Sequence, residues 1–414
     1  MNAFPAQLES DRAVPPARQW LAVAVLSLCT FIVVTSEMLP VGVLTPMAEG
    51  LGTTPGTAGY SLTITGLVAA ITAPVVPRLL GDFDRRAVVA VAMVLLAAGN
   101  ALTALAQDFT LLVVSRTVLG IGMGVVWSLA AVIAPRLVTP RHAALAVSLA
   151  VSGVAAASVI GVPLGTLIGE AFGWRSAFGT LTASALLLAA ALLIALPKLP
   201  KPAPTPDAAQ TGGRPLLRTP AVVVGLTVVV FLVTAHFAAY TFIRPVLETS
   251  TGISAAAIAA VLLTYGVFGL IGNFTSGALA AKRSRATVLL LALGILVAVA
   301  VLALFSALAA VAVAAIVVWG LAYGGVSVAG QIWMTRSATG NEENATGLYV
   351  GVFNASIALG AFLGGTVFEL AGMTPLLWTA AALAFIALTT GLLGPGPSTS
   401  TREEAPEKIP CPSP

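Results

Sequence analysis

The chain has 414 residues, of which 58% are hydrophobic and only 9% are charged, and its formal net charge is +4. A soluble domain carries roughly 25% charged residues, so this composition excludes an ordinary soluble protein. Two cysteines and two histidines cannot supply a disulfide framework or a clustered metal centre. Basic loops beside anionic lipid account for the positive charge, so we expect no nucleic-acid partner.

Twelve long apolar stretches follow one another along the chain. A helix needs about 20 apolar residues to cross the hydrocarbon of a bilayer. We place the crossings at 20–46, 57–77, 87–106, 109–134, 143–169, 174–196, 220–245, 255–280, 287–307, 310–335, 344–370 and 374–394. The sequence therefore predicts an all-α membrane protein with twelve transmembrane helices.

Lysine and arginine residues mark one side of the membrane. Arg116, Arg175 and Arg244 are exceptions, and the other basic residues lie in every second gap between the apolar stretches. Basic residues on short loops resist translocation and remain in the cytoplasm. The alternation predicts cytoplasmic tails at 1–19 and 395–414. Arginine outnumbers lysine, as is typical of a GC-rich bacterial genome, so we expect a multi-pass protein of the bacterial cytoplasmic membrane.

The longest polar interruption, 197–220, contains many Pro, Lys and Gly residues, which is typical of a cytoplasmic linker. It separates two bundles of six helices, 20–196 and 221–394. Residues at matching positions of the two bundles are Pro46 and Pro245, Gly66 and Gly266, Arg85 and Arg285, Gly120 and Gly320, Gly124 and Gly324, Gly161 and Gly360, and Gly165 and Gly364. An even number of crossings keeps both halves in one orientation, so we predict parallel repeats.

Two segments carry a family resemblance. They are Arg116-Thr-Val-Leu-Gly120-Ile-Gly122 in the fourth stretch and Gly161-Val-Pro163-Leu-Gly165-Thr166 in the fifth. They resemble the fourth-helix motif and the antiporter motif of the major facilitator superfamily, although Leu119 and Val162 replace a usual polar residue and a usual glycine. The resemblance extends over 20–394. It implies a carrier that works by alternating access, with motif or gating roles for Gly120, Gly161, Pro163 and Gly165.

The loop after the second stretch resembles the superfamily signature less well. Arg85 and Arg86 match its terminal basic pair, but Pro77 replaces the first glycine and the acid is displaced to Asp82 or Asp84. The resemblance implies a gating role for the two arginines, with the acidic partner left open.

Segments 35–42 (TSEMLPVG) and 240–245 (YTFIRP) are similar to the drug:proton antiporter group with twelve helices. Within that group they are most similar to the arabinose or sugar-efflux branch. This resemblance implies efflux coupled to protons, without naming the substrate.

Glu37 is an acidic residue deep within the first apolar stretch. It lies about 17 residues into the helix, roughly 26 Å from the inner end. An ionised acid at such depth costs about 2.5–3.5 kcal/mol, so Glu37 must face protein or a wet cavity. We expect it to bind and release the coupling proton. The alternative is a permanently paired structural acid.

Arg116 enters from the opposite side, about 10 Å below the outer surface, and so reaches a depth similar to that of Glu37. The resemblance implies that this arginine acts in proton coupling beside an acid of the first helix. We expect a Glu37–Arg116 contact in which pairing holds the acid ionised and protonation releases the arginine. The alternative is a static buried pair.

Several other side chains at membrane depth are candidates for a substrate cavity, namely Phe31, His236, Tyr240, Asn273, Gln331 and Asn354. His236 is either a neutral histidine bonded to a backbone carbonyl, or a second proton site or substrate contact. The three amides either form hydrogen bonds between helices or contact the substrate in the C-terminal half. The two aromatic residues either pack against helices or lipid, or line an apolar cavity for an amphipathic solute.

The sequence contains no G-x-x-x-x-G-K-[ST] motif of a nucleotide-driven motor and no repeated polar rings of a pore. We therefore predict a secondary carrier rather than an ATP-driven pump, a channel or an enzyme, without a cofactor and acting as a monomer. Its expected function is the export of a small amphipathic, drug-like solute in exchange for protons. The alternatives are a sugar or sugar-like metabolite exporter and, because these motifs do not encode direction, an importer.

Overall fold

The computed structural model describes residues 17–79, 83–199, 216–251, 254–338 and 342–397. Helices and short connections make up these residues, and no strand occurs among them. The middle of the predicted linker, most of both predicted tails and Asp82 lie outside the described residues.

The N-terminal half contains six crossings. Its elements are α2 (Ala17–Gly50), α3 (Pro55–Leu79), α4 (Arg85–Leu105), α5 (Phe109–Ile133), η1 (Ala134–Leu137), η2 (Pro140–His142), α6 (Ala143–Ala156), η3 (Ala157–Gly161), α7 (Val162–Phe172) and α8 (Trp174–Ala195). Elements α6, η3 and α7 follow one another without a loop and together form the fifth crossing.

The C-terminal half repeats this arrangement. Its elements are η5 (Leu216–Arg218), α9 (Pro220–Tyr240), α10 (Ile243–Val246), η6 (Leu247–Thr251), α11 (Ala255–Phe305), α12 (Ala309–Gly324), α13 (Val326–Ser337), α14 (Glu342–Ala371) and α15 (Met373–Leu393). In the described part of the chain, 11 helical stretches are long and apolar enough to cross a membrane. The longest is two crossings, because the backbone of Arg283 is not helical (φ −140°, ψ 71°). The prediction of twelve transmembrane helices is confirmed.

A proline explains the irregular fifth crossing. Pro163 stands in the first turn of α7, directly after the π-helical turn η3. Proline has no N–H and its ring displaces the carbonyl one turn earlier, so the regular hydrogen-bond ladder cannot continue through it. The motif segment that contains Gly161 is therefore a break in the helix.

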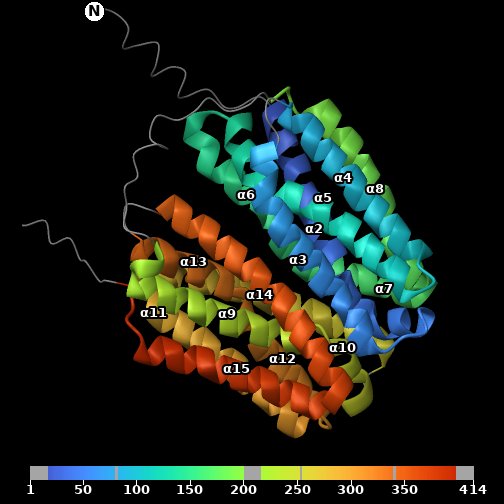
Figure 1. The fold of residues 1–414 in the computed structure, drawn as a ribbon, viewed down its shortest axis with the longest axis vertical. Coiled ribbons are helices and arrows are strands. Elements are labelled where there is room, and N and C mark those ends of the chain that lie inside the picture. Colours follow the sequence, from blue (N-terminus) through green and yellow to red (C-terminus); the bar gives the residue numbers. More distant parts are fainter. Residues whose placement is uncertain (1–16, 80–82, 200–215, 252–253, 339–341, 398–414) are drawn as a thin grey trace, which may run out of the picture.

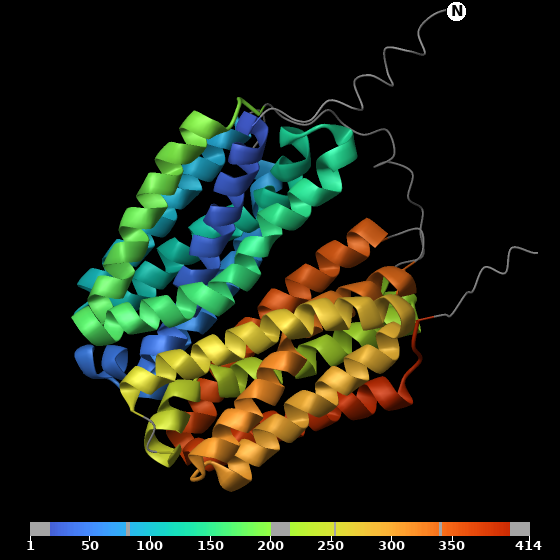
Figure 2. The ribbon, with the colours of Figure 1, turned by 180° about the vertical axis from the view of Figure 1, so that it is seen from behind.

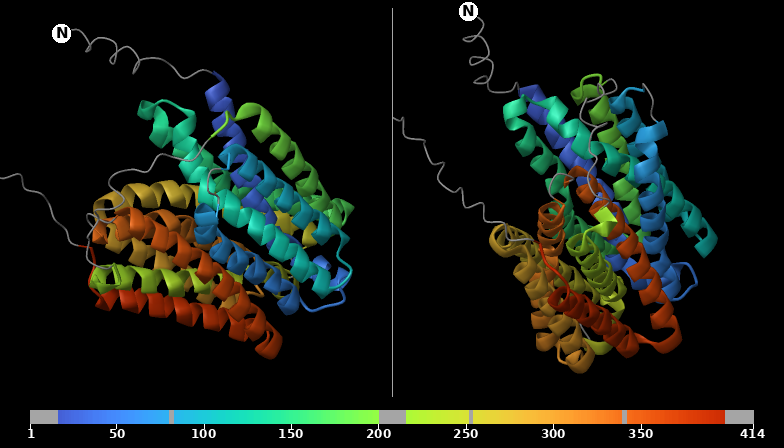
Figure 3. Two further views of the ribbon diagram at one scale, coloured as in Figure 1. Left: turned by 45° about the horizontal axis from the view of Figure 1, so that its top comes forward. Right: turned by 60° about the vertical axis from the view of Figure 1, so that its left-hand side comes forward.

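The two bundles lie closest together at the end that carries α10 and separate toward the opposite end, where α6 begins (Figure 1). We call these the converging end and the diverging end. The view from behind shows the same arrangement (Figure 2), and Figure 3 shows the N-terminal bundle lying across the C-terminal one. Two helix pairs join the halves, because α3 packs along α14 and the η3–α7 segment packs along α11.

The matched glycines lie at equivalent helix contacts in the two halves. A Cβ added to Gly165 would lie 2.6 Å from Cδ1 of Leu39 on α2. A Cβ on its counterpart Gly364 would lie 2.5 Å from the carbonyl oxygen of Ala238 on α9. Both contacts join the fifth crossing of a half to its first. Small residues allow helices to approach closely in a membrane, so these glycines set the packing of both bundles.

Candidate proton and substrate site

Glu37 and Arg116 lie together inside the N-terminal bundle. Glu37 on α2 is 4% exposed and Arg116 on α5 is 0% exposed. Arg116 reaches the residue directly before Glu37, because it binds the backbone of Ser36. No ion pair joins them in this conformation, and Oε1 of Glu37 and the Nε and Nη2 atoms of Arg116 have no hydrogen-bond partner among the described residues. The structure brings the two residues together without the direct contact that the sequence predicted.

A backbone carbonyl of α2 holds Arg116 in place. The Nη1 atom of Arg116 donates a hydrogen bond to the carbonyl oxygen of Ser36 at 3.1 Å. In a regular helix the N–H of residue 40 would donate to that oxygen, but residue 40 is a proline and has no N–H. Phe178 of α8 covers the guanidinium, with Cζ 4.9 Å from the ring centre. Pro40 therefore frees the acceptor that fixes Arg116 beside Glu37.

Asn100 extends this polar cluster toward α4. Its Nδ2 donates to the hydroxyl of Ser36 at 2.9 Å, and its Oδ1 has no hydrogen-bond partner among the described residues. Ser36 thus accepts from Asn100 through its side chain and from Arg116 through its backbone. Sequence reasoning did not single out Ser36, although its position four residues before Pro40 is the signal that marks its free carbonyl.

His236 and Tyr240 belong to a packed aromatic cluster in the C-terminal bundle. The His236 ring stacks on Tyr323 with 3.3 Å between the ring centres and on Tyr240 with 4.9 Å. Trp319 donates from Nε1 to Nδ1 of His236 at 3.0 Å. An indole N–H only donates, so Nδ1 carries no proton and this ring is neutral. The hydrogen-bond partner is a tryptophan, and the expected bond to a backbone carbonyl is absent among the described contacts of His236.

Tyr323 forms the more exposed edge of the aromatic cluster. It is half-buried, whereas His236, Tyr240, Tyr265 and Trp319 are buried.

The other substrate candidates are not brought together by any hydrogen bond of the described residues. Asn273 on α11, Gln331 on α13 and Asn354 on α14 are all half-buried. The Nδ2 atom of Asn354 donates within its own helix to the carbonyl of Val350 at 2.9 Å. Phe31 on α2 is half-buried as well and packs against the apolar core. Their roles in substrate binding stay predictions.

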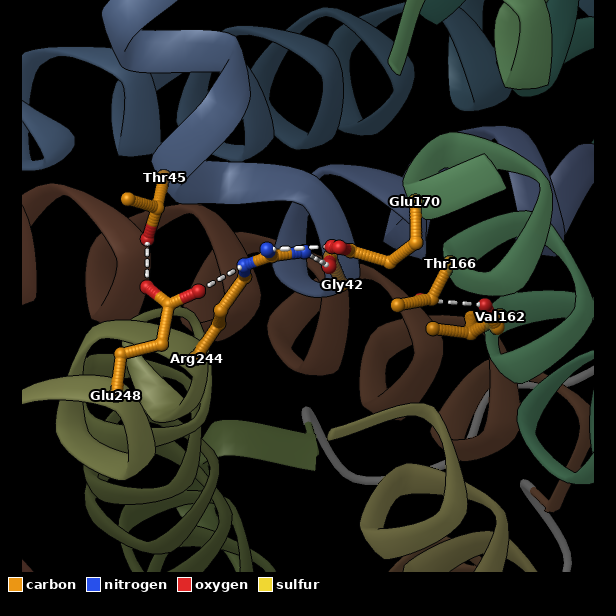
Figure 4. Close-up of polar contacts among 7 residues, drawn as sticks. All are labelled: Gly42, Thr45, Val162, Thr166, Glu170, Arg244 and Glu248. Atoms are coloured by element: carbon orange, nitrogen blue, oxygen red, sulfur yellow. Dashed lines mark hydrogen bonds and ion pairs between the residues drawn. The ribbon is translucent and has the colours of Figure 1, made fainter. Parts of the chain in front are cut away.

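A third group of polar residues closes the converging end (Figure 4). Arg244 of α10 is 3% exposed; its Nη2 lies 2.5 Å from Oε1 of Glu170, and its Nε lies 2.8 Å from Oε1 of Glu248. Its Nη1 donates to the carbonyl of Gly42 at 2.6 Å, and Thr45 donates to Oε2 of Glu248 at 2.5 Å. These five residues, which we call the Arg244 network, connect α10 and η6 of one half to α2 and α7 of the other.

A second contact supports the same end. Glu369 near the end of α14 accepts from the hydroxyl of Thr54 and from the N–H of Thr57, the latter at 3.0 Å. Tyr60 lies 3.2 Å from the hydroxyl of Thr366, also on α14. The two halves are thus tied through α3 and α14 as well as through the Arg244 network.

The arginines of the predicted gating loop lie at the diverging end. Arg86 donates from Nη1 to the carbonyl of Leu193 at the end of α8 (3.2 Å), and Arg85 donates to the carbonyl of Phe83 (2.6 Å). Arg285, the counterpart of Arg85, donates in the same manner to the carbonyl of Leu392 at the end of α15 (2.9 Å). Cations stabilise helix C-termini, so Arg86 and Arg285 cap the last helix of each half.

Asp84 supports this loop. Its carboxylate accepts from the N–H of Arg86 at 3.0 Å and from the N–H of Leu199 at 2.8 Å. Burial by itself would raise the pKa of Asp84, but these two N–H groups and the positive charge of Arg86 outweigh that effect and lower the pKa. Asp84 also lies 3.4 Å from Arg86, whereas Asp82, the other acid left open by the sequence, lies outside the described residues.

Among the described residues, no group of three or more His, Cys, Asp or Glu side chains could hold a metal ion. The polar groups that do converge are suited to moving a proton and to tying helices together.

Two relatives of this chain are named efflux pumps, and a third is named a transcription regulatory protein. A purine ribonucleoside efflux pump, NepI, of Shigella sonnei is 32% identical over 370 residues, which cover 89% of this chain and 93% of that protein. NepI of Escherichia coli K12 matches to the same extent. The transcription regulatory protein OpdE of Pseudomonas aeruginosa is 32% identical over 369 residues, covering 89% of this chain and 92% of that protein.

A solved structure with a similar fold is the crystal structure of a bacterial homologue of the human lysosomal transporter Spinster, in an inward-facing and unoccupied conformation. It has a TM-score of 0.71 and 16% sequence identity, and the match covers 92% of this chain and 95% of that one. The family model of the Major Facilitator Superfamily matches residues 26–342 and 226–412. The repeated six-helix bundles and the motifs of the fourth and fifth helices agree with these matches. The chain therefore belongs to the major facilitator superfamily, and it is a transporter rather than an enzyme.

Proposed function

We propose that the protein exports a small, uncharged amphipathic solute across the bacterial cytoplasmic membrane in exchange for protons. The observation that carries this proposal is the position of Glu37. It is a buried acid on α2, its Oε1 has no hydrogen-bond partner among the described residues, and the buried Arg116 is bound to the residue directly before it. An acid in that place can change charge inside one of the two bundles whose relative movement carries the solute.

Charge distribution supports an orientation with the diverging end in the cytoplasm. Basic residues of the described loops and helix ends gather there, including Arg86 and Arg285, whose contacts join the ends of α8 and α15. Such residues remain on the cytoplasmic side. The converging end then faces outward, and the structure is a state that is closed to the outside.

A purine ribonucleoside is the first substrate that we propose, within the wider class of drug-like amphipathic solutes. Relatives that are 32% identical over most of their length are named purine ribonucleoside efflux pumps. A planar base suits stacking on an aromatic surface, and Tyr323 of the aromatic cluster offers a half-buried ring. A sugar or sugar-like metabolite, which has no aromatic plane, is the second candidate, and it rests on the similarity of segments 35–42 and 240–245 to sugar-efflux carriers.

Proton exchange provides enough free energy for this task. A proton that moves inward through 100 mV contributes about 2.3 kcal/mol, which supports roughly a 50-fold gradient of an uncharged solute.

The test is transport by the purified protein in liposomes with an acidic interior. Radiolabelled inosine, adenosine and guanosine should accumulate inside, and a protonophore should abolish the accumulation, because outward proton flow drives it. Arabinose and a set of cationic drugs serve as competing substrates, and added ATP should change nothing. Accumulation that survives the protonophore would disprove proton exchange. Accumulation of arabinose but of no nucleoside would show that the substrate is a sugar, and it would leave the proposal of proton coupling intact.

A further inference from the structure

Helix α2 contains two prolines, Pro40 and Pro46, in the half that leads to the converging end. Each removes the N–H that would donate to the carbonyl four residues earlier. The freed acceptors are the carbonyls of Ser36 and Gly42. A buried carbonyl without a partner is costly, so each needs a donor from another helix.

Buried arginines supply both donors. Arg116 donates to Ser36 from within the same half, whereas Arg244 donates to Gly42 from the other half. A buried guanidinium likewise needs acceptors for its N–H groups, so each freed carbonyl supplies one of the acceptors that its arginine needs. The contact at Gly42 differs in one respect, because it joins the two halves of the protein.

The backbone of α2 is shaped for this contact. Val43, directly after Gly42, has non-helical angles (φ −122°, ψ 19°), so the outer end of the helix is bent at the point where the carbonyl meets Arg244. Gly42 also lies against Thr166 of α7 so closely that a Cβ would collide with the Thr166 hydroxyl. At this bend the carbonyl of Gly42 accepts from Nη1 of Arg244, as Figure 4 shows.

The rest of the Arg244 network adds to the same connection. Glu170 on α7 binds Arg244 across the interface between the halves, and Thr45 on α2 binds Glu248 across it. Charge-assisted hydrogen bonds to a buried arginine are about twice as strong as neutral ones. Opening the converging end would remove all of these contacts at once.

We propose that Pro46 makes the Gly42 carbonyl into a receptor for Arg244, and that this contact is the latch that keeps the outer side of the carrier closed. Arg244 acts by positioning the two halves and does not bind the solute. The inference rests on the proposed alternation between two states of the carrier. It holds whatever the substrate is and whichever ion drives transport.

The decisive change is Pro46→Ala. Alanine restores an N–H that donates to the Gly42 carbonyl within α2, so Arg244 loses its acceptor to a competitor while every side chain of the network stays in place. The matched control is Pro220→Ala. Pro220 stands in the first turn of α9, where a helix N–H has no partner within the helix, so this change should have no effect.

The measurement is a pair of spin-label distances in liposomes without substrate, in a protein freed of its cysteines by Cys29→Ala and Cys411→Ser. Labels at Phe172 and Leu370, which are 78% and 82% exposed, report on the converging end. Labels at Ile194 and Leu393, which are 74% and 88% exposed, report on the diverging end. No transport assay is involved, so failure of the proposed substrate or of proton coupling would not alter this result.

In Pro46→Ala we expect the population with a long Phe172–Leu370 distance to rise about tenfold or more, since a hydrogen bond to a charged group is lost, with a matching decrease in the Ile194–Leu393 distance. Arg244→Gln should produce the same shift in both distances. In the double variant, Pro46→Ala with Arg244→Gln, the shift should not exceed the larger of the two single-variant shifts. Distances in Pro46→Ala that equal those of wild type and of Pro220→Ala would overturn the proposal. Independent, additive shifts in the double variant would overturn it as well.

Discussion

Arg116 passes beside Glu37 and donates instead to the carbonyl oxygen of the preceding residue, Ser36, at 3.1 Å. The arginine is thereby fixed by the backbone and not by the acid. The Oε1 atom of Glu37 has no hydrogen-bond partner among the described residues, although the arginine is bound to the residue directly before it. This arrangement favours reversible protonation of Glu37 over a permanent ion pair.

Glu37→Gln should abolish proton-driven accumulation of the solute while leaving the protein inserted and folded. Glutamine has nearly the same shape but cannot titrate, so both halves can still exchange solute without a proton. Proteoliposomes should therefore show solute counterflow at a rate within about twofold of wild type and no uphill transport. Normal uphill transport by this variant would place the coupling proton elsewhere, with His236 as the next candidate.

Arg116→Ala should make Glu37 hold its proton more firmly, because a buried acid without a nearby cation favours its neutral form. Transport should then fall most at neutral internal pH and recover in part as the internal pH rises. The double variant Glu37→Gln with Arg116→Ala should be no worse than the more severe single one. Strictly additive losses, or an unchanged pH profile for Arg116→Ala, would show that the two residues act independently.

His236→Phe should lower the thermal stability of the protein without uncoupling transport. The change leaves the Nε1–H of Trp319, a fully buried residue, without its acceptor, at a cost of about 1–3 kcal/mol. Adding Trp319→Phe removes the unpaired donor and should recover part of the loss. Thermal unfolding in detergent measures both effects. A His236→Phe protein that binds solute but no longer transports it uphill would identify His236 as a proton carrier.

Labelling with a membrane-impermeant thiol reagent checks the orientation. In a protein without Cys29 and Cys411, Thr53→Cys should react in intact cells, because it lies at the converging end. Asp207→Cys and Arg402→Cys should react only after the cells are permeabilised. Labelling of Asp207→Cys in intact cells would contradict the cytoplasmic position of the linker.

Asp84→Ala should destabilise the fold by about 0.5–2 kcal/mol, the usual cost of losing an N-terminal cap. The pKa of Asp84 is lowered in the folded state, so its ionised form contributes stability above the unfolded pKa of about 3.9. That contribution is lost as the pH falls through the lower, folded pKa. The difference in melting temperature should stay constant from about pH 8 to pH 5 and shrink below about pH 4. Asp84→Asn, which can still cap α4, is the control, and it should lose less stability than Asp84→Ala.

The sequence predicted the fold closely because lipid imposes simple rules. A crossing must be long and apolar, and basic loops stay inside, so the spans follow from composition; even the break within α11 at Arg283 lies between two predicted stretches. The depth of Glu37 and Arg116 follows from counting residues along a helix. Their proximity was predictable from these depths together with the family resemblance.

The contacts of the site were less predictable. The expected Glu37–Arg116 contact is replaced by the bond to Ser36. No partner was assigned to Arg244 in the sequence analysis, and this arginine binds Glu248, Glu170 and Gly42. Asn273, Gln331 and Asn354 share polarity and depth but no common hydrogen bond among the described residues. Depth gives one coordinate of a side chain, whereas contacts depend on the rotation and tilt of every helix.

Pro40 and Pro46 show the boundary between what the sequence determines and what the tertiary structure decides. The sequence by itself determines that the carbonyls of Ser36 and Gly42 lack their helical donors, because proline has no N–H. Only the tertiary structure decides that Arg116 of the same half takes the first carbonyl and Arg244 of the opposite half takes the second. The physical reason is that a freed acceptor is a local property of the chain, while its donor is selected by which buried cation the packing of the two bundles brings within reach.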